Sequence, residues 1–268
     1  MKRAWLIGLL GLSSAGHAEV ACRGEAIQGG FLICRAEPGT EVRVDDIAVT
    51  ADDEGWFAAG INRDQTGELV IRAGEDERRF PIATREYDIQ RIDGLPPSKV
   101  NPYSEADLAH IARDRPLKAR GFSSRANGAW FVDGFQLPVT GARISGVYGS
   151  QRILNGEPRR PHYGIDYAAP TGTAVVAPAG GVVSLAGPDF FFEGGMVLID
   201  HGQGVISAFL HLSEVDVTEG DRVAPGDRIG AVGSTGRSTG PHLHWQITWR
   251  GRRVDPGLAL AVGSGDTG

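Results

Sequence analysis

The sequence predicts a mainly β protein with a small N-terminal β-sandwich or barrel, a short helical linker, and a C-terminal domain built on an antiparallel β-sheet. Glycine (39 residues) and proline (15 residues) are spread along the 268 residues, which is typical of many short strands joined by turns. Short runs of alternating apolar and polar residues occur on both sides of a Pro-rich segment. The apolar content of 41% is sufficient for a buried core.

The first 18 residues predict a secretory signal peptide. Two basic residues precede an apolar run from Ala4 to Leu12, and small residues Gly16 and Ala18 follow it. The run is far shorter than the ~20 residues that a membrane span requires. We therefore expect cleavage after Ala18, a periplasmic or extracellular location, and no stable membrane insertion of the mature chain. An uncleaved signal would instead tether the chain to the membrane.

The net charge disfavours nucleic-acid binding. The formal charge is −6, and removal of the two positive charges of Lys2 and Arg3 makes it −8. Proteins that bind nucleic acid usually carry a basic excess. Partners of this class are therefore not expected.

The two cysteines, Cys22 and Cys34, both lie near the mature N-terminus. In an oxidising compartment a disulfide that closes this short loop would add roughly 2–3 kcal/mol of stability. Two free buried thiols are the alternative. Neither interpretation makes a zinc site, because two cysteines without nearby histidines do not supply enough ligands.

The pattern of turns and strands divides the chain after the predicted signal peptide into four parts. Residues 19–95 read as the small β domain and residues 96–127 as a Pro-rich linker. In the linker, Ser104 and Asp107 form a capping-box pattern, and the helix that follows is expected to end before Pro116. Residues 128–260 form the second domain, whose segment "GGMVLIDHGQGVISAFLHL" predicts a β-hairpin, and residues 261–268 form a flexible tail.

Three segments of the second domain carry candidate functional residues. In "PHLHWQITW" the strand period places His242, His244 and Gln246 on one face and apolar residues on the other. In "RRPHYGIDYAAP", residues His162 and Asp166 share a face of an extended chain. Taken singly, each pair is more often a pair of ordinary surface residues.

The third segment is "ISAFLHLSEV", which supplies His211. The strand period places Ser207 and Phe209 on the same face as His211, with Ile206, Leu210 and Leu212 toward the core. A lone histidine here would more often be a hydrogen-bonded structural residue. We interpret His201 in "IDHGQG" in that structural way, as a turn residue, and the Gly-rich "GAVGSTGRSTG" as a flexible lead-in to His242.

Together these segments resemble the lysostaphin-type (LytM-like) zinc endopeptidases. The resemblance covers Trp130 to about Leu258 and includes "PHYGID", "HLS", "TGPHLHW", "APAGGVV" and the closing "VDP". It implies a metallopeptidase domain with one zinc ion per chain, held by His162, Asp166 and His244. It also implies that His211 and His242 remain unliganded and serve the reaction. Phe209 and Gln246 depart from the family, where many members have Tyr and Glu.

The resemblance implies a secreted zinc-dependent endopeptidase, a cell-wall hydrolase that cleaves peptide cross-links of bacterial peptidoglycan, with stem peptides as its partners. Three protein ligands leave a fourth position for a water whose pKa zinc lowers to about 7. Cleavage between D-alanine and a diamino acid is expected ahead of Gly-Gly bridges. The alternative is a non-catalytic LytM-like activator of another hydrolase, and a zinc- or glycan-binding module has less support.

Two further expectations concern the surroundings of the site. The N-terminal domain or the linker is expected to cover the groove and restrain activity, because a free wall hydrolase endangers its host. Arg152, Arg159 and Arg160 precede His162. They are candidates to meet stem-peptide carboxylates, although solvated surface arginines are an equally good interpretation.

Overall fold

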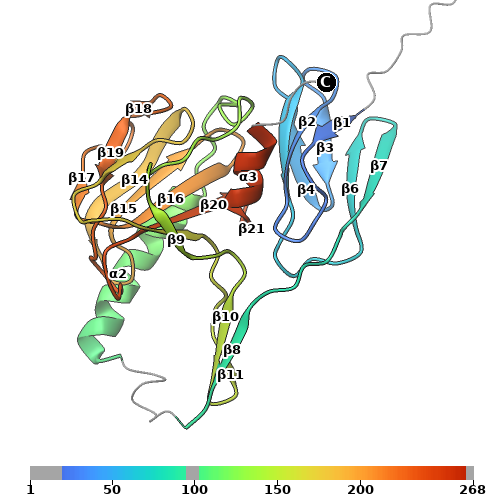
Figure 1. The fold of residues 1–268 in the computed structure, drawn as a ribbon. Helices are drawn as coiled ribbons and strands as arrows, with labels where there is room; N and C mark the ends of the chain where they lie inside the picture. Colours follow the sequence, from blue (N-terminus) through green and yellow to red (C-terminus); the bar gives the residue numbers. More distant parts are fainter. Residues whose placement is uncertain (1–19, 95–102, 264–268) are drawn as a thin grey trace, which may run out of the picture.

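The structure is a computed structural model that describes residues 20–94 and 103–263. The predicted signal peptide lies outside the described residues, as do Pro96, Pro97 and Pro102 of the predicted linker and residues 264–268 of the predicted tail. Strands dominate the described chain, which confirms the mainly β prediction (Figure 1). No helix among the described residues is long and apolar enough to cross a membrane.

Two antiparallel sheets form the N-terminal sandwich (Figure 1). One has the order β1-β2-β5 and the other β4-β3-β6-β7. Their strands are β1 (Ala21–Arg23), β2 (Phe31–Arg35), β3 (Glu41–Val44), β4 (Ile47–Thr50), β5 (Trp56–Gly60), β6 (Glu68–Ala73) and β7 (Asp76–Pro81). Val42, Val44 and Ile71 are fully buried and alternate with more exposed residues. One face of this sheet therefore packs on the core, as the strand period predicts.

The two cysteines are joined. Cys22 on β1 lies directly opposite Cys34 on β2, and a disulfide links them. This confirms the predicted pair and excludes the two free thiols. The bond fastens the first described strand to a strand whose Cys34 side chain is fully buried.

The C-terminal region is built on an eight-stranded antiparallel sheet. Its order is β18-β14-β15-β16-β20-β12-β9, with β21 paired to β20. The strands are β9 (Arg143–Gly146), β12 (Ile165–Ala168), β14 (Gly181–Phe190), β15 (Gly194–Asp200), β16 (Val205–Leu212), β18 (Arg222–Val223), β20 (Leu243–Trp249) and β21 (Arg252–Val254). A smaller sheet contains β13 (Ala174–Val176), β17 (Glu214–Val215) and β19 (Arg228–Ala231). The predicted hairpin is formed by β15 and β16.

The N-terminal sandwich and the large sheet share one hydrophobic core. The ring of Phe31 lies 6.3 Å from that of Phe131 and 5.9 Å from that of Phe135. A β-carbon on Gly60 would lie only 2.9 Å from Val254 and 3.1 Å from Trp249, so this glycine permits close packing of β5 against the sheet. Helix α3 (Pro256–Gly263) lies between the two parts (Figure 1). The two regions are therefore packed together along their apolar faces.

The hairpin between β15 and β16 also binds the sandwich. Gln203 at its tip has a positive φ of 52°. Its side-chain oxygen accepts a hydrogen bond from the backbone of Ala58 over 3.2 Å, and its amide donates to the backbone of Trp56 over 2.9 Å. The Gln203 side chain thus forms hydrogen bonds with backbone groups at the free edge of β5, which is the last strand of its sheet.

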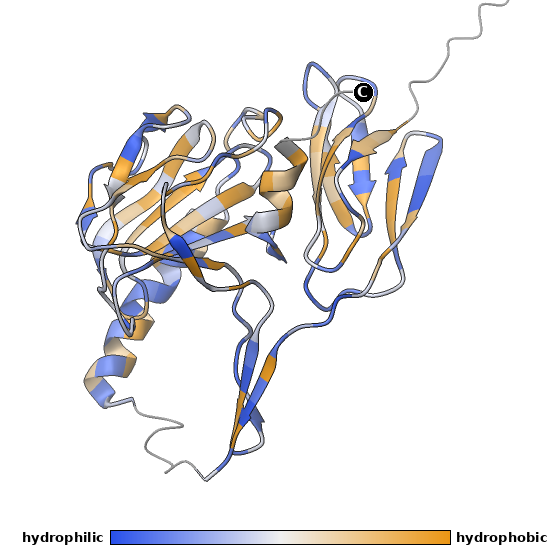
Figure 2. Ribbon diagram, viewed as in Figure 1, coloured by the Kyte–Doolittle hydropathy of each residue, from blue (hydrophilic) through white to orange (hydrophobic). Residues whose placement is uncertain are grey.

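A fifth sheet connects the two regions. Strand β8 (Ile89–Ile92), after the sandwich, pairs in parallel with β10 (Gln151–Leu154), which pairs with β11 (Glu157–Pro158). This small sheet extends away from the rest of the molecule (Figure 1). Hydrophobic residues are concentrated in the central strands of the large sheet and in α3, whereas β7 is mostly hydrophilic (Figure 2). The chain leading to His162 therefore begins in a sheet to which both regions contribute.

The linker helix is longer than predicted. Helix α2 covers Glu105–Phe122, begins at the predicted capping box of Ser104 and Asp107, and contains Pro116. The expectation that it ends before Pro116 was wrong. Tertiary contacts stabilise the second half: a β-carbon on Gly121 would lie 2.7 Å from Leu198, and Lys118 forms an ion pair with Glu193 over 2.7 Å. These contacts outweigh the backbone hydrogen bond that proline cannot make.

Candidate functional site

The three predicted metal ligands converge in the structure. His162 Nε2, Asp166 Oδ1 and His244 Nδ1 all lie within 4.8 Å of one another. His162 Nε2 is 3.0 Å from both Asp166 Oδ1 and His244 Nδ1, and the latter two atoms are 2.8 Å apart. Within residues 20–94 and 103–263 this is the one group of His, Cys, Asp or Glu side chains with metal-binding proximity.

Strand pairing explains how these side chains meet. Asp166 on β12 lies directly opposite His244 on β20, so both project from the same face of the sheet. His162 precedes β12, where its backbone exchanges hydrogen bonds with Gly149 and Ser150 over 2.7 and 2.8 Å. A β-carbon on Gly164 would lie 2.8 Å from His244 Nε2. A residue without a side chain is therefore needed between His162 and Asp166.

Hydrogen bonding orients the ring of His162. Its Nδ1 lies 2.9 Å from the carbonyl oxygen of Val147, which can only accept a hydrogen bond. Nδ1 therefore carries the proton, and Nε2 presents its lone pair to the cluster. A backbone partner on the second nitrogen is the usual support of a metal-binding histidine.

The electrostatics favour a carboxylate between two imidazoles. Burial alone would raise the pKa of Asp166, but hydrogen bonds and charges from His162 and His244 hold it far below its usual range. Burial lowers the pKa of His244. Burial also opposes protonation of His162, but Asp166 outweighs it, and the net pKa of His162 is raised. Asp166 is thus the permanent anion of the group.

This donor set fits a zinc ion. Zinc prefers imidazole nitrogen and carboxylate oxygen, and atoms bound at about 2.1 Å in a tetrahedron lie about 3.4 Å from each other. The three donors are 2.8–3.0 Å apart, so a small outward movement would accommodate the ion. Three protein ligands would leave one position for water or substrate.

His242 lies beside the cluster with its ring fixed. Its Nδ1 is 2.8 Å from the carbonyl oxygen of Gly240, so the proton lies on Nδ1 and Nε2 has a free lone pair. The Nε2 atom is 3.8 Å from Asp166 Oδ1. An isolated backbone bridge between Gly233 and His242 closes the Gly-rich loop at this point. His242 is therefore adjacent to the three donors but outside their triangle.

His211 reaches the site by a route that strand alternation did not predict. Its ring centre is 4.8 Å from that of His242 and 6.4 Å from that of His244. The expectation that Ser207 and Phe209 share its open face was wrong: both are fully buried, and Phe209 lies opposite Trp245. His211 has a φ of +67°, which breaks the alternation at the end of β16.

Both faces of β16 are in fact covered. Phe209 belongs to the main core, whereas Ile206, Ala208 and Leu210 pack in a second apolar cluster with Phe122 of α2. The predicted division into a core face and an open face therefore fails along this strand, although Leu212 does face the core as expected.

Thr235 supports His211 and was not singled out by the sequence. Its carbonyl oxygen accepts a hydrogen bond from His211 Nδ1 over 2.9 Å. Its hydroxyl donates to the carbonyl of Leu212 over 2.8 Å and accepts from the backbone of Gly195 over 2.9 Å. The Gly-rich lead-in is thus attached to β15 and β16. Burial, together with the neighbouring His242 and His244, lowers the pKa of His211 to about 4.

His201 has the structural role expected of it. It is fully buried, donates from Nδ1 to the carbonyl of Gly180 over 2.6 Å, and accepts at Nε2 from Ser207 over 2.8 Å. Ser207 in turn accepts a hydrogen bond from the indole of Trp245 over 3.2 Å. Its ring packs against that of Phe135 in the core.

Comparison with known proteins places the site in a family. Residues 160–256, which contain all five candidate residues, match peptidase family M23. DD-carboxypeptidase/endopeptidase Mpg of Neisseria meningitidis is 44% identical over 124 residues, 46% of this chain and 28% of the relative. Peptidoglycan DD-endopeptidase ShyA of Vibrio cholerae is 42% identical over 114 residues, 42% of this chain and 26% of the relative. The chain thus matches little more than a quarter of the length of these relatives.

A solved structure resembles almost the whole chain. A Pseudomonas aeruginosa protein assigned to the M23 peptidases is 29% identical, with a TM-score of 0.68 over 89% of this chain and 96% of the other. The fold and the site thus define a β protein with a peptidase-like domain. More specifically, residues 160–256 match peptidase family M23.

Proposed function

We propose that this protein is a secreted zinc-dependent endopeptidase that cleaves peptide cross-links of bacterial peptidoglycan. The observation that carries the proposal is the separation of five side chains into two groups. His162, Asp166 and His244 place three donor atoms together, and His211 and His242 lie beside them with free Nε2 atoms. A structural zinc site would instead use four protein ligands.

The names of the relatives support the substrate class. Two of them are named as enzymes that act on DD bonds, one of them specifically on peptidoglycan. We therefore propose that this chain meets stem peptides in the periplasm or outside the cell, and that it cuts between D-alanine and a diamino acid. Export would follow from the predicted signal peptide at residues 1–18.

The residues of the site divide the work as follows. His162, Asp166 and His244 would hold one zinc ion, which when bound supplies an activated water and polarises the scissile carbonyl. His242 Nε2 is the free nitrogen with the shortest recorded distance to the cluster, 3.8 Å, and accepts the proton of the attacking water. His211, neutral at pH 7, offers a second acceptor on the substrate side. The proton that His242 has accepted is then passed to the leaving amine.

Purified residues 19–268 incubated with cross-linked sacculi provide the test. We expect release of uncross-linked muropeptides, loss of this activity with a chelator, and its recovery on addition of zinc. The rival function is activation of another wall hydrolase. In that case fragments would be released only when a second hydrolase is added. If neither a chelator nor the His242→Ala substitution changed this release, the activator function would be established and the enzyme proposal overturned.

Restraint of the site by the N-terminal domain or linker remains a separate proposal. The sandwich shares its core with the sheet through Phe31 and Gly60, on the face away from His244. Residues 128–268 should therefore be compared with the full chain only after thermal unfolding shows that both fold. Higher specific activity of the shorter chain is expected, and equal activity would refute restraint.

A further inference from the structure

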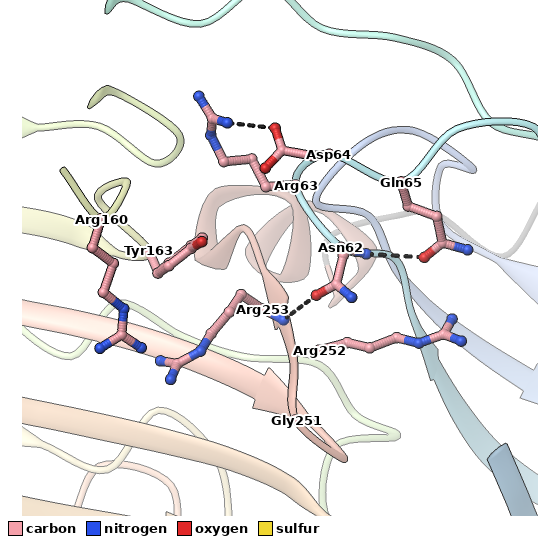
Figure 3. A pocket seen from close by; sticks show the side chains of 9 residues that line it. All are labelled: Asn62, Arg63, Asp64, Gln65, Arg160, Tyr163, Gly251, Arg252 and Arg253. Atoms are coloured by element: carbon pink, nitrogen blue, oxygen red, sulfur yellow. Dashed lines mark hydrogen bonds and ion pairs between the residues drawn. The ribbon is translucent and has the colours of Figure 1, made fainter. Parts of the chain in front are cut away.

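A cavity of 670 Å³ lies between the N-terminal sandwich and the large sheet. It is formed by the loop after β5, the turn between β20 and β21 with the start of β21, and the residues on either side of His162 (Figure 3). The lining residues are Asn62, Arg63, Asp64, Gln65, Arg160, Tyr163, Gly251, Arg252 and Arg253. Four arginines and one aspartate make this cavity strongly positive.

Two of the four arginines are already paired. Arg63 forms an ion pair with Asp64 and donates to the carbonyl of Gly149 over 2.8 Å. Arg252 points toward the sandwich, where it forms an ion pair with Asp45 over 2.8 Å (Figure 3). These side chains therefore stabilise the contact between the two regions and have little capacity for a ligand.

The other two arginines lack a carboxylate partner among the described residues. The guanidinium groups of Arg160 and Arg253 each lie 5.4 Å from the ring centre of Tyr163, and the two arginine side chains are directed to the same side of the cavity (Figure 3). Arg253 is half-buried. Burial, reinforced by the positive charge of Arg160, lowers the pKa of Arg253 to about 10. Like charges held together without a counterion favour the binding of an anion.

Arg253 belongs to the same face of the sheet as His244. Arg253 on β21 lies directly opposite Thr248 on β20, and Thr248 shares a face with His244. The four residues from His244 to Thr248 span about 13 Å of strand. At the other end, Tyr163 directly follows His162 in the chain. Arg253 thus lies on the face of His244, beyond Gln246 and Thr248, which are 8% and 3% exposed.

Gln246 lies between them on that face. It is 8% exposed. Its side-chain amide can both donate and accept a hydrogen bond. The face from His244 through Gln246 to Arg253 therefore offers, in order, metal donors, an amide and positive charge.

We propose that Arg160, Tyr163 and Arg253 form a subsite that binds a free carboxylate of the peptide substrate. At about 3.3–3.6 Å per extended residue, this carboxylate would lie about three to four residues from the bond that is cut. The inference rests on the proposed function for the identity of the ligand, a peptide rich in free carboxylates. The tyrosine ring holds both guanidinium groups in place, and they supply paired N–H donors to the carboxylate.

The test measures binding and cleavage separately. The ligands are a cross-linked muropeptide dimer with free carboxylates and the same dimer with its carboxylates amidated. Calorimetry on the zinc-loaded His242→Ala protein gives the Kd of each. We expect the free-carboxylate ligand to bind at least about tenfold more tightly, and Arg253→Gln to abolish this preference. In the active protein, Arg253→Gln should raise KM about ten- to hundredfold and change kcat less than about twofold.

Two further variants make the result decisive. Arg160 is exposed, so Arg160→Gln should fold normally and also lose the preference. Arg222→Gln removes the same charge from an exposed position on β18, at the far edge of the sheet, and should keep it. The subsite would be overturned by any of three results. These are equal Kd values for the two dimers, binding of neither dimer, or a preference for the free-carboxylate dimer that persists in Arg160→Gln and Arg253→Gln. Cleavage without preference refutes the subsite alone, whereas preference without cleavage refutes the endopeptidase alone.

Discussion

The backbone of His211 adopts φ +67° while its ring donates a hydrogen bond to the carbonyl oxygen of Thr235 over 2.9 Å. For a residue with a side chain this left-handed conformation costs roughly 1–2 kcal/mol. The conformation turns His211 out of the strand alternation and toward His242. Strained backbone at the end of β16 is therefore linked to the position of a candidate catalytic side chain.

Replacing His211 by glycine or by alanine should separate catalysis from strain. Both variants remove the imidazole, and we expect both to lose at least about 100-fold in activity. Glycine accepts a positive φ, so His211→Gly should be more stable than His211→Ala by about 0.5–1 kcal/mol in urea unfolding. Greater stability of the alanine variant would show that the left-handed backbone is not retained in solution.

His242, just before β20, and His244 on β20 are expected to respond differently to mutation. His244→Ala removes a donor atom that lies 2.8 Å from Asp166, so bound zinc and activity should both be lost. His242→Ala leaves the three donors in place, and activity should fall about 100-fold or more while zinc content stays near one per chain. Metal analysis after dialysis distinguishes the two. Equal loss of zinc from both variants would make the histidines joint ligands and contradict the assignment.

Gly164 should tolerate no side chain. A β-carbon there would lie 2.8 Å from His244 Nε2 and would also meet the backbone of Trp245, so Gly164→Ala must displace β20. We expect a loss of about 1–3 kcal/mol in unfolding free energy and weaker zinc binding. Gly240→Ala is the matched control, because a β-carbon there meets nothing within 4 Å. Normal zinc content in Gly164→Ala would show that the cluster can relax around the added methyl group.

Regular local patterns made part of this site predictable. The alternation in β20 correctly placed His244 and Gln246 on the face away from the fully buried Leu243 and Trp245, although Gln246 is itself only 8% exposed. The motifs around His162 and His211 completed the resemblance to the lysostaphin-type endopeptidases, and the metal ligands were predicted from that resemblance. The capping box of α2 was equally local and was confirmed.

Long-range contacts could not be predicted in the same way. The direction of His211 depends on one unusual φ, and the continuation of α2 beyond Pro116 depends on contacts of Lys118 and Gly121 with the distant sheet. The parallel pairing of β8 with β10 joins segments about 60 residues apart, and neither segment carries a sign of its partner. Likewise, Arg253 gave no indication that it would lie near Arg160.

The buried His201 should make stability depend on pH. Burial lowers its folded pKa to about 4, below the reference value of 6.5, so the unfolded chain binds the proton more readily between these values. Its contribution is therefore fully present above about pH 6.5 and is lost as pH falls toward 4, by roughly 3 kcal/mol in total. His201→Gln keeps a donor for Gly180 and an acceptor for Ser207 but does not titrate. Urea unfolding with chelator present should show a lower free energy at pH 7 for the variant and a flatter decline toward pH 4, whereas parallel declines would show that His201 is not the group responsible.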